Sequence, residues 1–269
     1  MSRRRCNPPP SPFCCAGQPA LLYASSSHQE ALARLHFLID QQRSLGLLTG
    51  GEGSGKTLVL ATLLDQLPPS QCPACLVNLT GFELRDFLDE LASGLHAAAR
   101  PGDALTTRWQ RIGERLRANR LLGLSSVVLL DDADAAAQEV QAAVLRLVKS
   151  QPAGLTLVLA ANPARQARLG DELLQLSQLR IPLEPWEPEE VKEYLQAAIA
   201  RAGGDPRIFE DAAVERLCEL SNGVPRWVAQ LAELTWLAAA NTAGQPIGAE
   251  TVESAYELLS APYHAALVG

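Results

Sequence analysis

The chain has 269 residues, a length that suits one large domain followed by a small one. Apolar residues make up 47% of it and its formal net charge is −7, which weakly disfavours a protein that coats itself in nucleic acid. No run of about 18 apolar residues occurs, so the sequence predicts no membrane span. Prolines follow Arg3-Arg4-Arg5, which argues against a secretory signal.

Residues 1–20 are rich in proline and lack periodicity, so they are expected to form an irregular arm. Its arginines are interpreted as a solvated tail, with a nucleic-acid or membrane contact as the alternative. Ser27 and Glu30 then predict a capping box at the start of a helix that extends to about Arg43. His28 lies in the first turn of this helix, where it is either exposed or in contact with a nucleotide base.

The most informative stretch lies between an apolar run, residues 45–49, and a helix-like run, residues 58–67. It reads Gly50-Gly51-Glu52-Gly53-Ser54-Gly55-Lys56-Thr57 and matches the phosphate-binding pattern G-x4-G-K-[ST]. Glycines let the backbone turn sharply and direct its N–H groups at a phosphate, and the following helix N-terminus adds partial positive charge. Lys56 is expected to reach the β- and γ-phosphates of ATP, and Thr57 to bind Mg²⁺. These eight residues and Leu58 form the predicted nucleotide-binding set.

A strand over residues 74–79 is predicted next, followed by helices over residues 83–100 and 105–122. Five arginines lie along the second helix without sharing one face: Arg108, Arg111, Arg115, Arg117 and Arg120. A solvated or subunit-facing surface is the favoured interpretation, and a nucleic-acid track is the alternative.

Cys72-Pro-Ala-Cys75 has the spacing of a zinc-ligand pair, and Cys14-Cys15 could supply two further thiolates. Adjacent cysteines coordinate one metal awkwardly, however. Reduced thiols in a cytoplasmic protein are therefore the favoured interpretation, and a zinc site is the alternative.

The run Ser126 to Leu130 predicts a fully buried strand that ends in Asp131-Asp132. The carboxyl ends of parallel strands form the edge where open α/β sheets bind ligands. Asp131 is therefore predicted to hold Mg²⁺, and Asp132 to orient the water that attacks the γ-phosphate. A helix is expected from Asp134 onward.

Another buried strand is predicted over residues 155–160, and it ends at Asn162-Pro163. The Asn162 amide could hydrogen-bond the attacking water or the γ-phosphate, although Asn-Pro also opens ordinary turns. A short helix over residues 166–176 and a strand over residues 179–183 follow.

From Trp186 onward the sequence predicts helices alone, marked by Pro188, Val214, Pro225 and Val252. The predicted division is therefore an irregular arm over residues 1–20, an α/β phosphate-loop domain over residues 21–185 and a small helical domain over residues 186–269.

This order of elements resembles the AAA+ ATPases, and more narrowly the ExeA/GspA-like ATPases of bacteria. Two similar segments are residues 21–35, Leu-Leu-Tyr-Ala-Ser-Ser-Ser-His-Gln-Glu-Ala-Leu-Ala-Arg-Leu, and residues 221–231, Ser-Asn-Gly-Val-Pro-Arg-Trp-Val-Ala-Gln-Leu. The resemblance implies a three-layer AAA+ domain with a parallel sheet, followed by an all-helical lid. It also implies ATP and Mg²⁺ as ligands, and hydrolysis where the subunits of an ATP-dependent homo-oligomer meet.

The resemblance assigns roles to single residues. It identifies Lys56-Thr57 as Walker A, Asp131-Asp132 as Walker B and Asn162 as sensor 1. In the lid, Arg226 resembles sensor 2, a cation that contacts the γ-phosphate. An arginine finger from a neighbouring subunit is also implied, for which Arg180 and Arg168 compete.

Asp132 stands where the family usually has a glutamate, which is longer by one methylene group. Slow hydrolysis is therefore predicted, in the manner of a switch. Secretion is not implied, since the sequence predicts neither the membrane anchor nor the peptidoglycan-binding part of secretion-type relatives.

Three functions compete. The first is an ATPase that regulates an unidentified protein partner, the second a DNA-associated ATPase resembling TniB/TnsC-type transposition regulators, and the third a nucleotide-gated scaffold that does not hydrolyse ATP. The acidic net charge favours a protein partner over DNA.

Overall fold

The computed structural model describes residues 12–13, 25–98, 100, 102–150, 154–239 and 245–265, with side chains up to residue 259. The chain divides into two compact units, residues 27–184 and residues 185–269 together with the segment up to Ser26. Most of the predicted arm, the Cys14-Cys15 pair and the start of the segment 21–35 lie outside the described residues.

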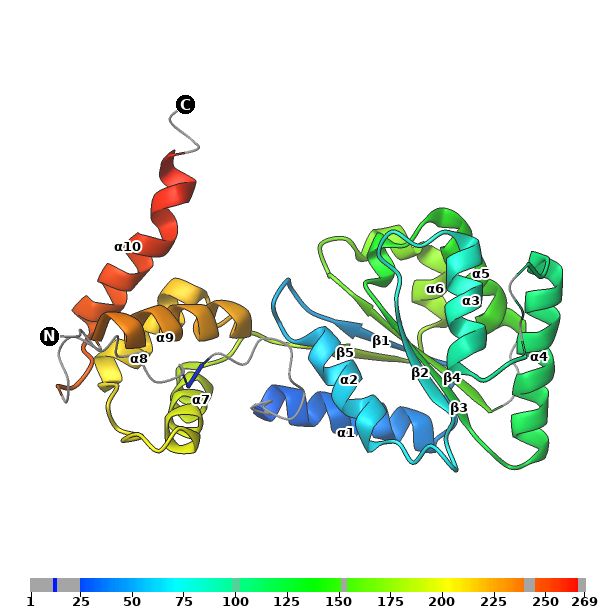
Figure 1. The fold of residues 1–269 in the computed structure, drawn as a ribbon, viewed down its shortest axis with the longest axis horizontal. Helices are drawn as coiled ribbons and strands as arrows, with labels where there is room; N and C mark the ends of the chain where they lie inside the picture. The colour runs from blue at the N-terminus through cyan, green and yellow to red at the C-terminus, as the bar shows by residue number, and fades with distance from the viewer. Residues whose placement is uncertain are drawn as a thin grey trace, which may run out of the picture. The chain divides into compact units, whose positions relative to one another are not determined.

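A parallel sheet with the strand order β2-β3-β4-β1-β5 forms the centre of the first unit (Figure 1). Its strands are β1 (Leu45–Thr49), β2 (Ala74–Asn78), β3 (Ser126–Asp131), β4 (Leu155–Ala161) and β5 (Leu179–Pro182). All residues of β3 and β4 are buried, as expected where helices cover both faces of a parallel sheet. The carboxyl ends of the strands meet at one edge of the sheet, and this edge carries the predicted site.

Helices cover both faces of the sheet (Figure 1). One face packs against α1 (Ser26–Asp40) and α2 (Lys56–Gln66), and the other against α3 (Leu84–Gly94), α4 (Leu105–Leu121), α5 (Gln138–Ser150) and α6 (Asp171–Leu176). Along β3 the side chains alternate, since Val127 and Leu129 join the first core, whereas Val128 and Leu130 join the second. The result is the predicted three-layer arrangement.

Phe87 of α3 is fully buried against the sheet, whereas Phe37 of α1 is 56% exposed. We expect Phe87→Ala to lower the free energy of unfolding by roughly 3–5 kcal/mol, because apolar contacts are lost and a cavity is left. Phe37→Ala is the matched control and should change that free energy by less than about 0.5 kcal/mol. Chemical denaturation followed by circular dichroism measures both, and equal destabilisation would contradict a central role for Phe87.

The second unit is helical and consists of α7 (Pro188–Arg201), α8 (Asp211–Ser221), α9 (Pro225–Ala239) and α10 (Ala249–Ala265). Helix α7 begins as predicted, with a proline in the first turn and a capping box of Glu187 and Glu190. Phe13 packs into the core of this unit, with its ring centroid 6.1 Å from that of Tyr194 and 6.2 Å from that of Phe209. Among the helices of the described chain, none combines the length and apolar character needed to cross a bilayer.

Two predicted helix limits, the start of α1 and the end of α3, are wrong. Helix α1 begins at Ser26, one residue before the predicted capping residue Ser27, and the Glu30 carboxylate forms an ion pair with Arg34. The helix predicted over residues 83–100 ends at Gly94 in a Schellman motif. His96 takes the left-handed position of that motif with φ 54°, where a sequence analysis looks for glycine.

Two further limits near the predicted site are also wrong. Asp134 does not begin a long helix, because it lies in the 3₁₀ turn η2 (Ala133–Ala135), and α5 starts only at Gln138. The helix predicted over residues 166–176 is divided at Gly170, where φ is 79°. Its two parts are the 3₁₀ helix η3 (Gln166–Leu169) and α6.

Cys72 and Cys75 are buried free thiols on opposite faces of the sheet, since Cys72 joins the core under α1 and α2 and Cys75 the core under α3. The two side chains therefore do not converge on one metal ion. Burial raises the pKa of the Cys75 thiol to about 12, which opposes formation of the thiolate that zinc requires. The described residues contain no group of three or more potential metal ligands.

Three of the five arginines on α4 make contacts inside the unit, and for Arg108, which is buried, the prediction of a solvated or subunit-facing surface is wrong. Arg108 is buried and pairs with Asp89 of α3, with Nη2 3.1 Å from Oδ2. The Arg111 guanidinium forms an ion pair with Asp103 at 2.9 Å. Arg115 Nε donates to the Leu95 carbonyl at 3.0 Å. These contacts hold α4 against α3 and its following loop.

Candidate functional site

The loop between β1 and α2 has a conformation that requires glycine. Gly53 and Gly55 have φ values of 81° and 95°, in the left-handed region. A Cβ atom at Gly50 would collide with Ser54 Oγ, and one at Gly55 would lie 2.5 Å from His28 Nε2. The loop is therefore a close-packed cradle of backbone in which side chains have no room at these positions.

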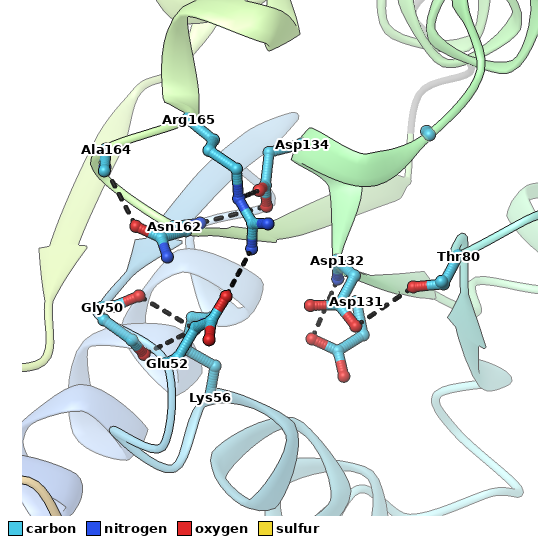
Figure 2. A network of polar contacts seen from close by, with 12 residues as sticks. Gly50, Glu52, Lys56, Thr80, Asp131, Asp132, Asp134, Asn162, Ala164 and Arg165 are labelled. Atoms are coloured by element: carbon cyan, nitrogen blue, oxygen red, sulfur yellow. Dashed lines mark hydrogen bonds and ion pairs between the residues drawn. The ribbon is translucent and has the colours of Figure 1, made fainter. Parts of the chain in front are cut away.

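Lys56 lies inside this cradle (Figure 2). Its Nζ donates hydrogen bonds of 2.9 Å to each of the carbonyl oxygens of Gly50 and Gly51. Burial lowers the pKa of Lys56, and the charges of Asp131 and Asp132 oppose that shift. An ammonium group enclosed by loop backbone is placed to exchange carbonyl oxygens for phosphate oxygens.

Thr57 and Asp131, which come from α2 and β3, meet directly. Thr57 Oγ1 donates to Asp131 Oδ2 at 2.6 Å, and the Asp132 N–H donates to Asp131 Oδ1 at 3.0 Å. Burial raises the pKa of the Asp131 carboxyl, while the hydrogen bond from Thr57 opposes that shift. A hydroxyl and a carboxylate side by side are ligands of the kind that Mg²⁺ prefers, so these two residues fit the predicted metal.

Asp132 is held at the tip of β2. Its backbone is left-handed, with φ 50°. Its carboxylate accepts a hydrogen bond from Asn78 Nδ2 at 3.0 Å and one from Thr80 Oγ1 at 3.3 Å, the second of which is drawn in Figure 2. No motif in the sequence includes either partner. Asn78 is the last residue of β2 and lies one position before the end of the strand predicted over residues 74–79, so its place at the same sheet edge was the available signal.

Asn162 directly follows β4, and its side chain shapes the turn there. Its Oδ1 accepts from the Ala164 N–H at 3.0 Å, and its own N–H donates to Asp134 Oδ1 at 3.0 Å (Figure 2). The turn that the Asn-Pro pair suggests is thus formed. The side-chain Nδ2 is the group left to donate toward a phosphate or a water.

Arg165 connects this turn to the phosphate loop. Its Nε lies 2.9 Å from Asp134 Oδ2, and its Nη2 donates to Glu52 Oε1 at 3.2 Å (Figure 2). Neither Arg165 nor the ion-pairing role of Asp134 was predicted. Glu52 was included only as a member of the loop.

His28 is buried, so its interpretation as an exposed residue is wrong. Its Nε2 lies 2.9 Å from the Ser54 carbonyl oxygen, which places the ring beneath the phosphate loop. The two residues are 26 positions apart in the chain and meet because α1 and α2 pack on the same face of the sheet. A contact between His28 and a nucleotide base stays a prediction.

The three arginines with predicted catalytic roles are exposed. Arg180, in β5, donates through Nη2 to the Leu174 carbonyl at 3.0 Å, and Arg168 lies in the last turn of η3. Arg226 lies in the first turn of α9, in the helical unit. Their assignment as arginine finger and sensor 2 therefore stays a prediction.

Comparison with known proteins supports this interpretation of the fold and the loop. Residues 39–169 match the protein family described as AAA domain. The chain is 32% identical over 235 residues to General secretion pathway protein A of Aeromonas hydrophila, an alignment that covers 85% of this chain and 43% of that protein. The chain thus spans less than half the length of this relative. The similarity confirms the resemblance to ExeA/GspA-like proteins.

Solved structures share the fold at low sequence identity. The ORC1 protein of Aeropyrum pernix in complex with DNA gives a TM-score of 0.64 at 19% identity, covering 87% of this chain and 65% of that one. Cdc6p from Pyrobaculum aerophilum gives 0.67 at 18% identity, with coverages of 91% and 69%. The RuvB Holliday junction branch migration motor of Thermotoga maritima gives 0.58 at 18%, with coverages of 87% and 68%. The predicted fold class, a parallel AAA+ sheet followed by a helical region, is confirmed.

Proposed function

The chain contains an AAA domain and is homologous to General secretion pathway protein A, and from this premise we propose that it binds ATP with Mg²⁺ and hydrolyses it slowly to change the conformation of a protein partner or assembly. The observation that carries the proposal is the 2.6 Å hydrogen bond between Thr57 and Asp131, which are 74 positions apart in the chain. It joins a phosphate-binding loop to an acid on another strand of the same sheet. These are the parts that a nucleotide triphosphatase needs together.

Each residue has a distinct task in the proposed reaction. The N–H groups of the loop and the Lys56 ammonium bind the β- and γ-phosphates. Thr57 and Asp131 would hold Mg²⁺, which when bound neutralises part of the phosphate charge. Asp132 orients the attacking water, and Asn162 Nδ2 donates to that water or to the γ-phosphate.

The position of the Asp132 carboxylate supports slow hydrolysis. The hydrogen bonds from Asn78 and Thr80 hold this carboxylate, which has one methylene group less than the glutamate usual in the family, at the tip of β2. Water activation at the γ-phosphate requires this carboxylate to leave those partners. If this release limits the rate of hydrolysis, the protein stays in its ATP-bound conformation for long periods, as a nucleotide-dependent switch does.

The contacts of the arginines on α4 favour a protein partner over DNA. Arg108, Arg111 and Arg115 are engaged with α3 and its loop, so three of the five cations considered for a nucleic-acid track are already used. Cytoplasmic location is part of the proposal, supported by the free thiols of Cys72 and Cys75.

One experiment separates the three candidate functions. The full chain is sized by light scattering with ATP, with ADP and without nucleotide, each with and without duplex DNA, and phosphate release is measured in parallel. We expect larger assemblies with ATP than with ADP, phosphate release at high protein concentration, and no DNA retention. Salt-sensitive, ATP-dependent retention of DNA would favour the DNA-associated ATPase. Assembly with ATP but without phosphate release would favour the scaffold.

A further inference from the structure

Arg165 is a cation beside the phosphate loop that belongs to none of the motifs recognised in the sequence. It ends a turn in which its N–H donates to the Asn162 carbonyl at 2.9 Å, so the tip of β4 fixes its backbone. Its guanidinium extends toward Glu52 of the loop (Figure 2). The side chain thereby links the two segments expected to surround the γ-phosphate.

The two ends of this link differ in strength. Asp134 is 1% exposed, contacts Arg165 Nε at 2.9 Å, and also accepts from the Asn162 N–H. Glu52 is 72% exposed, and its 3.2 Å contact with Arg165 Nη2 is of the exposed kind that contributes little to stability. Arg165 is therefore fixed through Asp134 and easily released by Glu52.

The charge of bound ATP would compete with Glu52 for this guanidinium. Glu52 and Asp134 both act electrostatically on the Lys56 ammonium, which places them in the same local field as the phosphate cradle. A γ-phosphate presents more negative charge than a carboxylate and matches the planar fork of a guanidinium. ADP has no γ-phosphate and would leave the Glu52 contact in place.

We propose that Arg165 distinguishes ATP from ADP by exchanging Glu52 for the γ-phosphate while it keeps its contact with Asp134. The exchange frees Glu52 on the loop, while the Asp134 contact keeps the guanidinium beside the turn at Asn162. Arg165 is then a specificity-determining residue for the triphosphate. This inference rests on the ATP binding proposed above and adds the residue that reads the third phosphate.

Nucleotide titrations of the full chain with Mg²⁺ test the proposal, using ADP and a slowly hydrolysed ATP analogue. For Arg165→Gln we expect the analogue to bind at least about tenfold more weakly, whereas the affinity for ADP changes by less than about twofold. For Glu52→Gln the analogue should bind about threefold or more tightly, again with ADP unchanged, because the competitor for the guanidinium is removed. Opposite signs for the two partners of one ion pair are not expected of a merely structural contact.

Controls keep the result interpretable. Arg34→Gln and Glu30→Gln remove the partners of an exposed arginine–glutamate pair on α1 and should leave both affinities unchanged. Arg165→Lys keeps a positive charge near buried Asp134 but lacks the planar guanidinium, so it separates the loss of guanidinium geometry from the loss of folded structure. Thermal unfolding without nucleotide checks that each variant is folded.

An Arg165→Gln protein that keeps the parent's ratio of analogue to ADP affinity would overturn the inference. Equal weakening of both nucleotides in the folded Arg165→Lys protein would do so as well. A parent protein that binds neither nucleotide would instead overturn the proposed function itself.

Discussion

Lys56→Ala is expected to weaken ATP binding by at least about 100-fold, since hydrogen bonds to charged groups contribute about 1.5–3 kcal/mol each and Lys56 is placed to make two of them. The two carbonyl oxygens that its Nζ now contacts, those of Gly50 and Gly51, mark the rim of the cradle. Because burial already lowers the pKa of this ammonium, a bound phosphate would supply the counter-charge that its surroundings provide only in part. Isothermal titration calorimetry with ATP and Mg²⁺ measures the change.

The control for this experiment is Lys149→Ala, which removes an exposed lysine that pairs with Glu172 on the surface of the same unit. It should bind ATP with the affinity of the parent. Parent-like affinity in Lys56→Ala would contradict the role assigned to the loop, and with it the ATPase proposal.

Replacement of Asp132 is expected to have the second largest effect, this time on turnover. Asp132→Asn removes the carboxylate that orients water and should lower phosphate release by at least about 100-fold, within the range found for general acid–base groups. Asp132→Glu adds one methylene group, about 1.5 Å of reach, and should raise phosphate release. Steady-state phosphate release at saturating ATP compares the three proteins, and equal rates in all of them would contradict the role of Asp132.

Asn78→Ala tests whether the contact at the tip of β2 restrains Asp132. The substitution removes the 3.0 Å hydrogen bond and leaves the longer one from Thr80, so it should raise turnover several-fold without changing ATP affinity. An unchanged rate would show that the hydrogen bond does not limit hydrolysis. A rise in Asp132→Glu but not in Asn78→Ala would assign the slow rate to side-chain length alone.

Features that depend on neighbours in the chain could be predicted from the sequence. The phosphate loop is one contiguous run of eight residues, and its glycines predict a backbone conformation that the φ values of Gly53 and Gly55 match. The apolar run that ends at Asp131 predicted a buried strand of the correct extent, because every position of such a strand must be apolar or paired. In the second unit, Pro188 and Pro225 predicted the starts of two helices, and apolar positions marked by Val214 and Val252 predicted the other two.

Helix limits were predicted less well wherever the chain ended a helix without the usual residue. His96 occupies the left-handed position that ends α3, and no local pattern predicts a histidine there. Asp134 follows a strand and resembles a helix start, yet its carboxylate is used by the backbone of Asn162 and by Arg165. Contacts across the sheet decided the local structure at that position.

The side chains that surround the loop come from distant parts of the chain and could not be predicted from local sequence. His28 reaches the loop from 26 positions away, Asn78 reaches Asp132 across 54 positions, and Arg165 reaches Glu52 across 113. Each is a single polar residue in an ordinary helix, strand end or turn, and its neighbours in the chain do not show which side chain it contacts. Parallel strands bring their carboxyl ends to one edge whatever their separation in the chain, so polar residues far apart in the sequence meet at the predicted site.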